Sequence, residues 1–399
     1  MRVISLFSGA GGMDLGFINE GFEIVWSNDM FLEATQTYKR NIGEHIVLGD
    51  ITKIDSSEMP DNIDVVIGGF PCQGFSVANT KRTIEDKRNF LYKEMLRVIK
   101  DKKPKVFVAE NVKGILSLAG GKVFEMIKKD FEDLGYTVDA KVLNAAEYGV
   151  PQARERVIIL GNRIGKKNKF PNKTHYIKDK IYDEDISGLL PAITVEDAIG
   201  YLADVRLSHA PIEIGNKIIY NHVASENVSD MFWGRKYEVN QHEICDYLRE
   251  WRKKSGWSTK KIDEHFGYKH TAGHWFRKDN NSGSIPKPED WWELKKIMGF
   301  DDKYDLQVTT LIEKQIKFEQ SLRITNWDRP SDTITATGPE IHINKKRRLS
   351  VRECAILQTF PEEFVFEGSL HRMYTQIGNA VPVKLAQKVA SEVRKLIEE

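Results

Sequence analysis

The chain has 399 residues, 41% hydrophobic and 29% charged, which is enough for two buried cores and excludes a disordered or fibrous protein. The chain has 59 basic and 58 acidic side chains, so its net charge is only +1. A polyanionic partner would therefore have to bind to a locally basic surface. The three cysteines form no CxxC pair, no apolar stretch reaches the roughly 18 residues of a membrane helix, and the N-terminus lacks a signal-peptide core. These features predict an intracellular protein without a disulfide framework.

Residues 1–165 alternate short β-branched runs with amphipathic stretches, which predicts an α/β sheet with helices on its faces. Strands are expected at residues 3–7, 22–26, 64–67, 106–109 and 157–160, with a further strand ending near Asp50. Helices are expected at Phe90–Asp101 and Val123–Leu134, the second of them ended by Gly135.

A shift in composition after Gly165 indicates an inserted domain. A Lys/Asn-rich linker covers residues 166–169, and the sheet-like rhythm does not return until about Ser321. Six of the eight tryptophans fall between residues 231 and 300, in a window that is also locally basic. Helical periodicity then returns in residues 347–399.

Part of this insertion has the pattern of a helix-turn-helix. We expect Ser258 to cap a helix that runs through residues 262–266, Gly267 to turn, and residues 271–278 to form a second helix that enters the major groove. The expected DNA contacts here are Lys260, Lys261, Lys269, His274, Arg277 and Lys278. The alternative is that the two helices only pack together through Trp257, Phe266 and Trp275.

The segment after the first strand is rich in glycine. Residues 7–14 read Phe-Ser-Gly-Ala-Gly-Gly-Met-Asp and lead into a helix, which is typical of a loop that lets a nucleotide-type cofactor approach backbone amides. Asp14 stands where the dinucleotide fingerprint needs its third glycine, which argues against binding of a nicotinamide dinucleotide. Asp29 is placed to bind ribose hydroxyls and Asp50 to meet an adenine, although each acid alone is also typical of a turn or cap.

Three further positions carry reactive or charged side chains. Cys72 lies in Gly-Phe-Pro-Cys-Gln after the fourth strand, where its flanking residues predict an exposed loop and a candidate nucleophile. The alternative for Cys72 is a buried, inert thiol, which we expect for Cys245 and Cys354. Glu110 ends an apolar strand, where burial would raise its pKa and keep a proton available, unless it is a helix-capping acid.

Two arginines stand at the start of the last strand. Because Arg154 and Arg156 are two residues apart, we expect them to point to one face and hold an anion or a carbonyl. Taken singly, each is equally typical of a surface salt bridge.

Six motifs in one order resemble the bacterial DNA (cytosine-5) methyltransferases of the restriction-modification type. The motifs are Phe7–Gly12, Pro71–Gln73, Glu110–Val112, Gln152–Arg156, Arg329–Thr335 and Gly378–Pro382. The resemblance covers residues 1–165 and 321–399, and the region between corresponds to the variable target-recognition domain of that family. Asp29 stands where many members have glutamate, which keeps the carboxylate but shortens it.

The resemblance implies a Rossmann-like, S-adenosylmethionine-dependent methyltransferase sheet domain with an inserted, smaller target-recognition domain. We expect the catalytic domain at residues 1–165 and 370–399, the recognition domain and hinge at 166–369, and the helix-turn-helix-like segment at about 240–300.

The same resemblance implies roles for individual residues. Cys72 would attack carbon 6 of a flipped cytosine while protonated Glu110 binds ring nitrogen 3 and the exocyclic amine. The implied catalytic residues are Cys72, Glu110, Arg154, Arg156 and Pro71, and Gln73 and Ser76 are expected to contact DNA. The implied cofactor-binding residues are Phe7, Ser8, Gly9, Gly11, Gly12, Asp29, Asp50, Ile51, Asn379 and Val381. No metal is expected, and the product would be S-adenosylhomocysteine.

The implied partner is double-stranded DNA, bound by a monomer, with a restriction endonuclease that acts separately or with none. We expect a cytoplasmic, nucleoid-associated bacterial protein without membrane contact. A tRNA cytosine methyltransferase is one alternative, but such enzymes lack a large insertion. A DNA-binding regulator without chemistry is another, against which the intact catalytic set argues. Adenine and exocyclic-amine methylases are excluded because the chain has no Pro-Pro pair.

Overall fold

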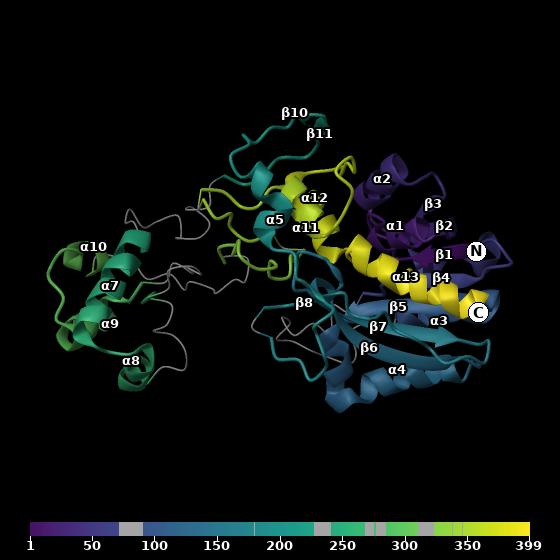
Figure 1. The fold of residues 1–399 in the computed structure, drawn as a ribbon, viewed down its shortest axis with the longest axis horizontal. Coiled ribbons are helices and arrows are strands. Elements are labelled where there is room, and N and C mark those ends of the chain that lie inside the picture. The colour runs from purple at the N-terminus through teal and green to yellow at the C-terminus, as the bar shows by residue number, and fades with distance from the viewer. Residues whose placement is uncertain are drawn as a thin grey trace. The chain divides into compact units, whose positions relative to one another are not determined.

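The computed structural model forms two compact units (Figure 1). The first comprises residues 1–223, 327–338 and 350–399, and the second comprises residues 224–326 and 339–349. The structure describes residues 1–71, 91–178, 180–226, 241–267, 275–276, 285–309, 323–336, 338–344 and 346–399. Within these residues, no helix has the length and apolarity needed to cross a bilayer. The division by function into residues 1–165 with 370–399 and 166–369 stays a prediction.

The first unit contains a mixed seven-stranded sheet of order β3-β2-β1-β4-β5-β7-β6. The strands are β1 (Arg2–Leu6), β2 (Glu23–Asp29), β3 (Ile46–Leu48), β4 (Val65–Gly68), β5 (Val106–Val112), β6 (Thr137–Asn144) and β7 (Glu155–Asn162). Strand β7 is antiparallel to β5 and β6, and the other pairs are parallel. This confirms the predicted α/β sheet, although β6 was not among the expected strands.

Helices cover both faces of this sheet (Figure 1). They are α1 (Gly12–Asn19), α2 (Leu32–Asn41), α3 (Tyr92–Lys102), α4 (Lys122–Glu132) and α13 (Val383–Glu398). Two of them match the predicted helices, and Gly135, at φ 86°, follows the second as expected. Residue 90, where the first was expected to begin, lies outside the described residues.

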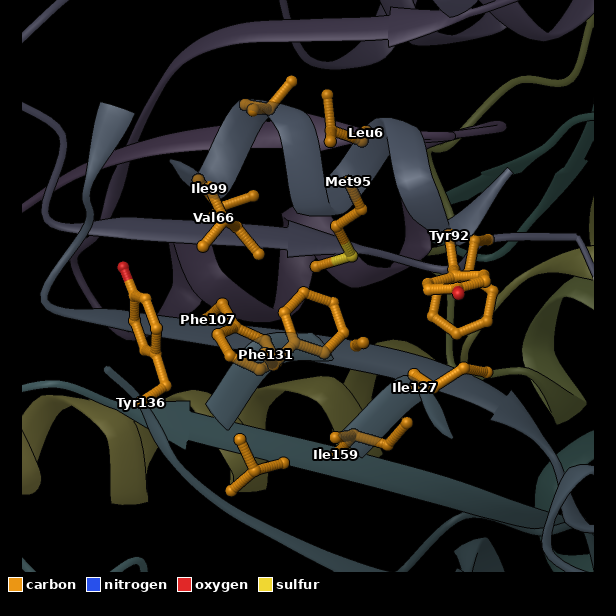
Figure 2. Close-up of a cluster of buried hydrophobic side chains, with 14 of the residues drawn as sticks. Leu6, Val66, Tyr92, Met95, Ile99, Phe107, Ile127, Phe131, Tyr136 and Ile159 are labelled. Carbon is orange, nitrogen blue, oxygen red and sulfur yellow. The ribbon is translucent and has the colours of Figure 1, made fainter. Parts of the chain in front are cut away.

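Alternation along the central strands separates two cores. Strand residues such as Leu6 and Phe107 point toward α3 and α4, as Figure 2 shows. Strand residues of the opposite alternation, such as Val3 and Val108, point to the other face, where α1 and α13 pack. Both faces are therefore buried, so these strands read as nearly continuous apolar runs.

The first unit also contains further strands and helices outside this sheet. They are β8 (His175–Tyr176), β9 (Leu190–Pro191), α5 (Val195–Ile199), β10 (Ile212–Ile214), β11 (Lys217–Ile219), α11 (Val351–Leu357) and α12 (Leu370–Asn379). Helix α11 begins at a capping box of Ser350 and Glu353, and Ser369 caps α12.

The described residues 241–309 of the second unit are mostly helical, whereas its segments 323–326 and 339–349 form turns and isolated β-bridges where they are described. Its helices are α7 (Gln241–Ser255), α8 (Thr259–Phe266), α9 (Pro288–Met298) and α10 (Asp305–Thr309). Ser258 caps α8 and Gly267, at φ 69°, ends it, which confirms the first helix of the expected pair. Trp275 is buried and packs edge-on against Phe266, as the alternative of simple packing required. Phe276 is also described and buried, whereas residues 271–274 and 277–278 of the expected second helix lie outside the described residues, so groove insertion stays a prediction.

Candidate active site

The predicted cofactor loop, residues 7–12, connects β1 to α1 at the carboxyl edge of the sheet. The amide of Ser8 donates to the carbonyl of Asn28 at 2.9 Å, and the amide of Gly11 donates to the carbonyl of Ser8 at 2.9 Å. Gly9 and Gly11 have φ values of 56° and 89°, in the left-handed region that glycine adopts without strain. The loop is therefore a tight turn whose backbone needs glycine at these two positions.

The three predicted glycines have different surroundings. A Cβ atom added at Gly9 would meet nothing within 4 Å. At Gly11 it would lie 2.2 Å from Cδ1 of Ile42, and at Gly12 it would lie 2.5 Å from the carbonyl oxygen of Val381. Gly9 alone of the three has open space beside it, whereas Gly11 and Gly12 allow the loop to pack against α2 and the start of α13.

Asp29 ends β2 beside this loop. One oxygen of its carboxylate accepts from the amide of Gly9 at 2.8 Å, and the other accepts from the amide of Phe31 at 2.9 Å. The residue is only 8% exposed, and this burial raises the pKa of Asp29 against the lowering effect of its backbone hydrogen bonds. Asp29 thus connects the end of β2 to the cofactor loop.

Apolar side chains follow Asp29 on the surface, which the sequence analysis missed. Met30, Phe31 and Leu32 are 61%, 47% and 52% exposed. Three exposed apolar side chains in succession are unusual at a strand end and provide an apolar surface beside the Asp29 carboxylate.

The other predicted cofactor residues lie within the first unit. Asp50 follows β3, is exposed, and caps a short 3-10 helix by accepting from the amide of Thr52 at 3.0 Å; this hydrogen bond lowers the pKa of Asp50. Ile51 is buried. Asn379, the last residue of α12, is exposed, and Val381 is buried with its carbonyl against Gly12.

The second group of predicted residues meets at the junction of β5 and β7. Arg156 lies opposite Val112, so Arg156 and Glu110 are diagonal neighbours on one face of the sheet. The Nε atom of Arg156 lies 2.7 Å from Oε1 of Glu110, and both side chains are nearly buried, at 12% and 11% exposure. Burial lowers the pKa of Arg156, and Glu110 opposes that effect. Glu110 therefore has a charged partner rather than the purely apolar surroundings that the sequence indicated.

Two residues that the sequence analysis did not single out support this pair. A Cβ atom at Gly69 would lie 2.9 Å from Oε2 of Glu110, so the absence of a side chain makes room for the carboxylate. The side-chain amide of Asn111 donates to the carbonyl of Phe70 at 3.1 Å and so ties β5 to the turn before Pro71. The position of Asn111 directly after Glu110 was the available signal.

Pro71 is half-buried and is the last described residue of that turn. Cys72, Gln73 and Ser76 lie outside the described residues.

Arg154 lies elsewhere than expected. It precedes the first residue of β7, so strand alternation does not set its direction. Its guanidinium is buried and donates to the carbonyls of Ile334 at 2.9 Å and Gly378 at 2.7 Å. Arg154 thus joins three segments that are distant in sequence, while Arg156 contacts Glu110.

The predicted DNA contacts that can be placed are Lys260 and Lys261, both exposed on α8 in the second unit. Lys269, His274, Arg277 and Lys278 lie outside the described residues. Across the part of the chain that is described, no group of three or more His, Cys, Asp or Glu side chains is arranged to hold a metal ion.

The sequence matches the C-5 cytosine-specific DNA methylase family over residues 1–395. It is 33% identical to the type II methyltransferase M.NgoFVII of Neisseria gonorrhoeae over 98% of this chain and 86% of that protein. It is 31% identical to the type II methyltransferase M.AgeI of Thalassovita gelatinovora over the full length of both.

Among solved structures, the fold is similar to that of a predicted DNA modification methyltransferase encoded within a prophage (E. coli), with a TM-score of 0.61 at 22% identity and full coverage of both chains. The Dnmt2 methyltransferase of S. pombe gives a TM-score of 0.54 at 16% identity, again over both full chains. These likenesses concern the fold alone. On the match of nearly its whole length, the chain belongs to the C-5 cytosine-specific DNA methylase family and is a DNA cytosine-5 methyltransferase of the type found in restriction-modification systems.

Proposed function

We propose that this enzyme methylates one cytosine within a specific sequence of duplex DNA through a covalent adduct with Cys72. The observation that carries the proposal is the buried Glu110–Arg156 pair, whose atoms lie 2.7 Å apart where β5 and β7 meet. A carboxyl group and a guanidinium side by side match the polar edge of cytosine, which presents a ring nitrogen, an amine and a carbonyl.

Carbon 5 of cytosine is a poor nucleophile, so the ring must first be activated. The Cys72 thiolate adds to carbon 6, while Glu110, protonated in the complex, donates to ring nitrogen 3 and accepts from the exocyclic amine. Arg156 donates to the cytosine carbonyl, Arg154 holds the backbone beside it, and Pro71 shapes the turn before the thiol. Once carbon 5 carries the new methyl group, loss of its proton to solvent water expels the thiolate and restores the aromatic ring.

The family uses S-adenosylmethionine, and the residues around the glycine loop fit it. The open space at Gly9 would let the cofactor approach the backbone. The carboxylate of Asp29 suits ribose hydroxyls, and the exposed side chain of Met30 suits an adenine ring. When bound, this cofactor supplies the methyl group to carbon 5 and leaves as S-adenosylhomocysteine. The residues that would hold it are Phe7, Ser8, Gly9, Gly11, Gly12, Asp29, Asp50, Ile51, Asn379 and Val381.

DNA recognition is assigned to the region between residues 166 and 369. The enzyme acts as a monomer that flips the target base out of the duplex, because the reacting atoms are inaccessible in a stacked pair. Lys260 and Lys261, both exposed, support phosphate contacts in the second unit. Lys269, His274, Arg277 and Lys278 are proposed to join them, and Gln73 and Ser76 to contact DNA near the flipped base.

The test is transfer of labelled methyl from S-adenosylmethionine to unmethylated duplex DNA and, in parallel, to tRNA, by wild type and Cys72→Ser. We expect label at one short DNA motif and none with the variant. Label in tRNA alone would contradict the proposal, and DNA binding without transfer to either substrate would favour a regulator.

A further inference from the structure

A chain of buried polar side chains lies beneath the glycine loop and takes no part in the mechanism above. Asp14 is completely buried in α1, and its two carboxylate oxygens accept from the hydroxyls of Ser5 and Tyr38, each at 2.7 Å. The Tyr38 hydroxyl also lies 3.0 Å from Nε2 of His45, and the Ser8 hydroxyl lies 3.0 Å from that of Ser5. From the sequence alone, Asp14 was notable only because it replaces a fingerprint glycine.

The chemistry of the carboxylate sets the direction of these hydrogen bonds. An ionised carboxylate only accepts, so the protons of Ser5 and Tyr38 both point inward to Asp14. Ser5 then has lone pairs left to accept from Ser8. An asparagine at position 14 would offer one acceptor and one donor group, so one of the two hydroxyls would have to give up its present hydrogen bond.

The cofactor loop rests on this chain at two points. Ser8, within the loop, is held by Ser5 from below. At Gly11 a Cβ atom would lie 3.0 Å from Cδ2 of Tyr38, so the loop backbone packs directly on the tyrosine ring. Gly9, the glycine with open space beside it, lies between these two points of support.

We propose that Asp14 is a positioning residue for the cofactor loop: through Ser5 and Tyr38 it fixes Ser8 and Gly11, and so keeps the backbone at Gly9 shaped for S-adenosylmethionine. This inference rests on the proposed function, in which the loop binds that cofactor. The acid contacts neither cofactor nor cytosine, so its effect falls on cofactor affinity rather than on the chemical step.

The experiment uses the full chain and the variants Asp14→Asn and Tyr38→Phe. The dissociation constant for S-adenosylhomocysteine is measured by calorimetry, together with kcat and the KM values for S-adenosylmethionine and DNA. We expect the dissociation constant and the cofactor KM to rise about 10-fold in each variant, as the loss of one buried hydrogen bond predicts. At saturating cofactor, kcat and the KM for DNA should stay within about two-fold of wild type. The double variant should be little worse than either single one, because both remove the same interaction.

Glu147→Gln is the matched control, since Glu147 is also a buried acid of the first unit and instead pairs with Lys180. It should leave cofactor affinity unchanged. Wild-type affinity in both test variants, or a fall in kcat at unchanged affinity, would overturn the inference. If Asp14→Asn does not fold, Tyr38→Phe decides alone. A wild-type enzyme that fails to bind S-adenosylhomocysteine would instead refute the proposed cofactor site, so the two failures can be told apart.

Discussion

The two halves of the candidate active site are built in opposite ways. On the proposed cofactor side the groups offered are mainly backbone, in the loop of residues 7–12, and we have proposed that the hydrogen-bonded side chains of Asp14 and Tyr38 hold that backbone in place. On the cytosine side the groups offered are the side chains of Glu110 and Arg156, and the strands hold them. The difference predicts that substitutions on the cofactor side change affinity and stability, whereas those on the cytosine side change the rate.

The largest effect is expected for Glu110→Gln. The amide offers the same donor and acceptor but cannot transfer its proton to ring nitrogen 3 as negative charge develops on the ring, so kcat should fall about 1,000-fold, within the range seen for lost transition-state stabilisation. Affinity for S-adenosylhomocysteine should be unchanged. Single-turnover methyl transfer with calorimetry of the cofactor complex measures both. Equal losses in rate and affinity would remove the distinction between the two halves.

Gly69→Ala should have an intermediate effect. Its Cβ would lie 2.9 Å from Oε2 of Glu110, so the carboxylate must move by a few tenths of an ångström. We expect a fall in kcat of about 30-fold, because a small displacement of a catalytic group is costly. Gly188→Ala, which meets nothing within 4 Å, is the control. A rate equal to that of the control would show that Glu110 tolerates the methyl group.

The pH dependence of the free energy of unfolding should reveal the burial of Asp14, with an effect smaller than that of Gly69→Ala on the rate. Burial is the main cause that raises its pKa from 3.8 to about 6, so near pH 5 the folded protein holds a proton that the unfolded chain has lost. This contribution to stability is lost as the pH rises through about 6. Between about pH 5 and about pH 7 the free energy of unfolding should therefore fall by about 1.3 kcal/mol more in wild type than in Asp14→Asn. Denaturant unfolding at the two pH values measures the difference, and parallel curves would contradict it.

The smallest effect is expected for Gly9→Ala. The site is open, so the cost is the left-handed backbone alone, about 1 kcal/mol of unfolding free energy. Gly11→Ala should cost clearly more, because its Cβ would also meet Ile42 at 2.2 Å. Thermal or denaturant unfolding of both variants compares them. A larger loss of unfolding free energy for Gly9→Ala than for Gly11→Ala would mean that the backbone conformation of the loop matters more for stability than its packing against Ile42.

Local patterns predicted most of the sheet and several of the helices, whereas the proposed roles of the site residues came from the family resemblance. Apolar alternation and glycine turns placed the parallel strands, α4 and α8, because these signals depend on neighbours a few residues away. Strand β6 was missed, since its residues 137–144 are half-exposed and only partly apolar. Asn111 adjoined a recognised residue, but nothing local indicated that its amide would bind the carbonyl of Phe70.

The sequence by itself determined the family, the order of the motifs and the residue types available for chemistry. Only the tertiary structure decided how those residues are used. Arg154 and Arg156 are nearly identical in sequence context, yet one binds carbonyls of residues 180 and 224 positions away and the other pairs with Glu110. Such partners are set by which strands and segments become neighbours on folding, and spacing along the chain carries no record of that.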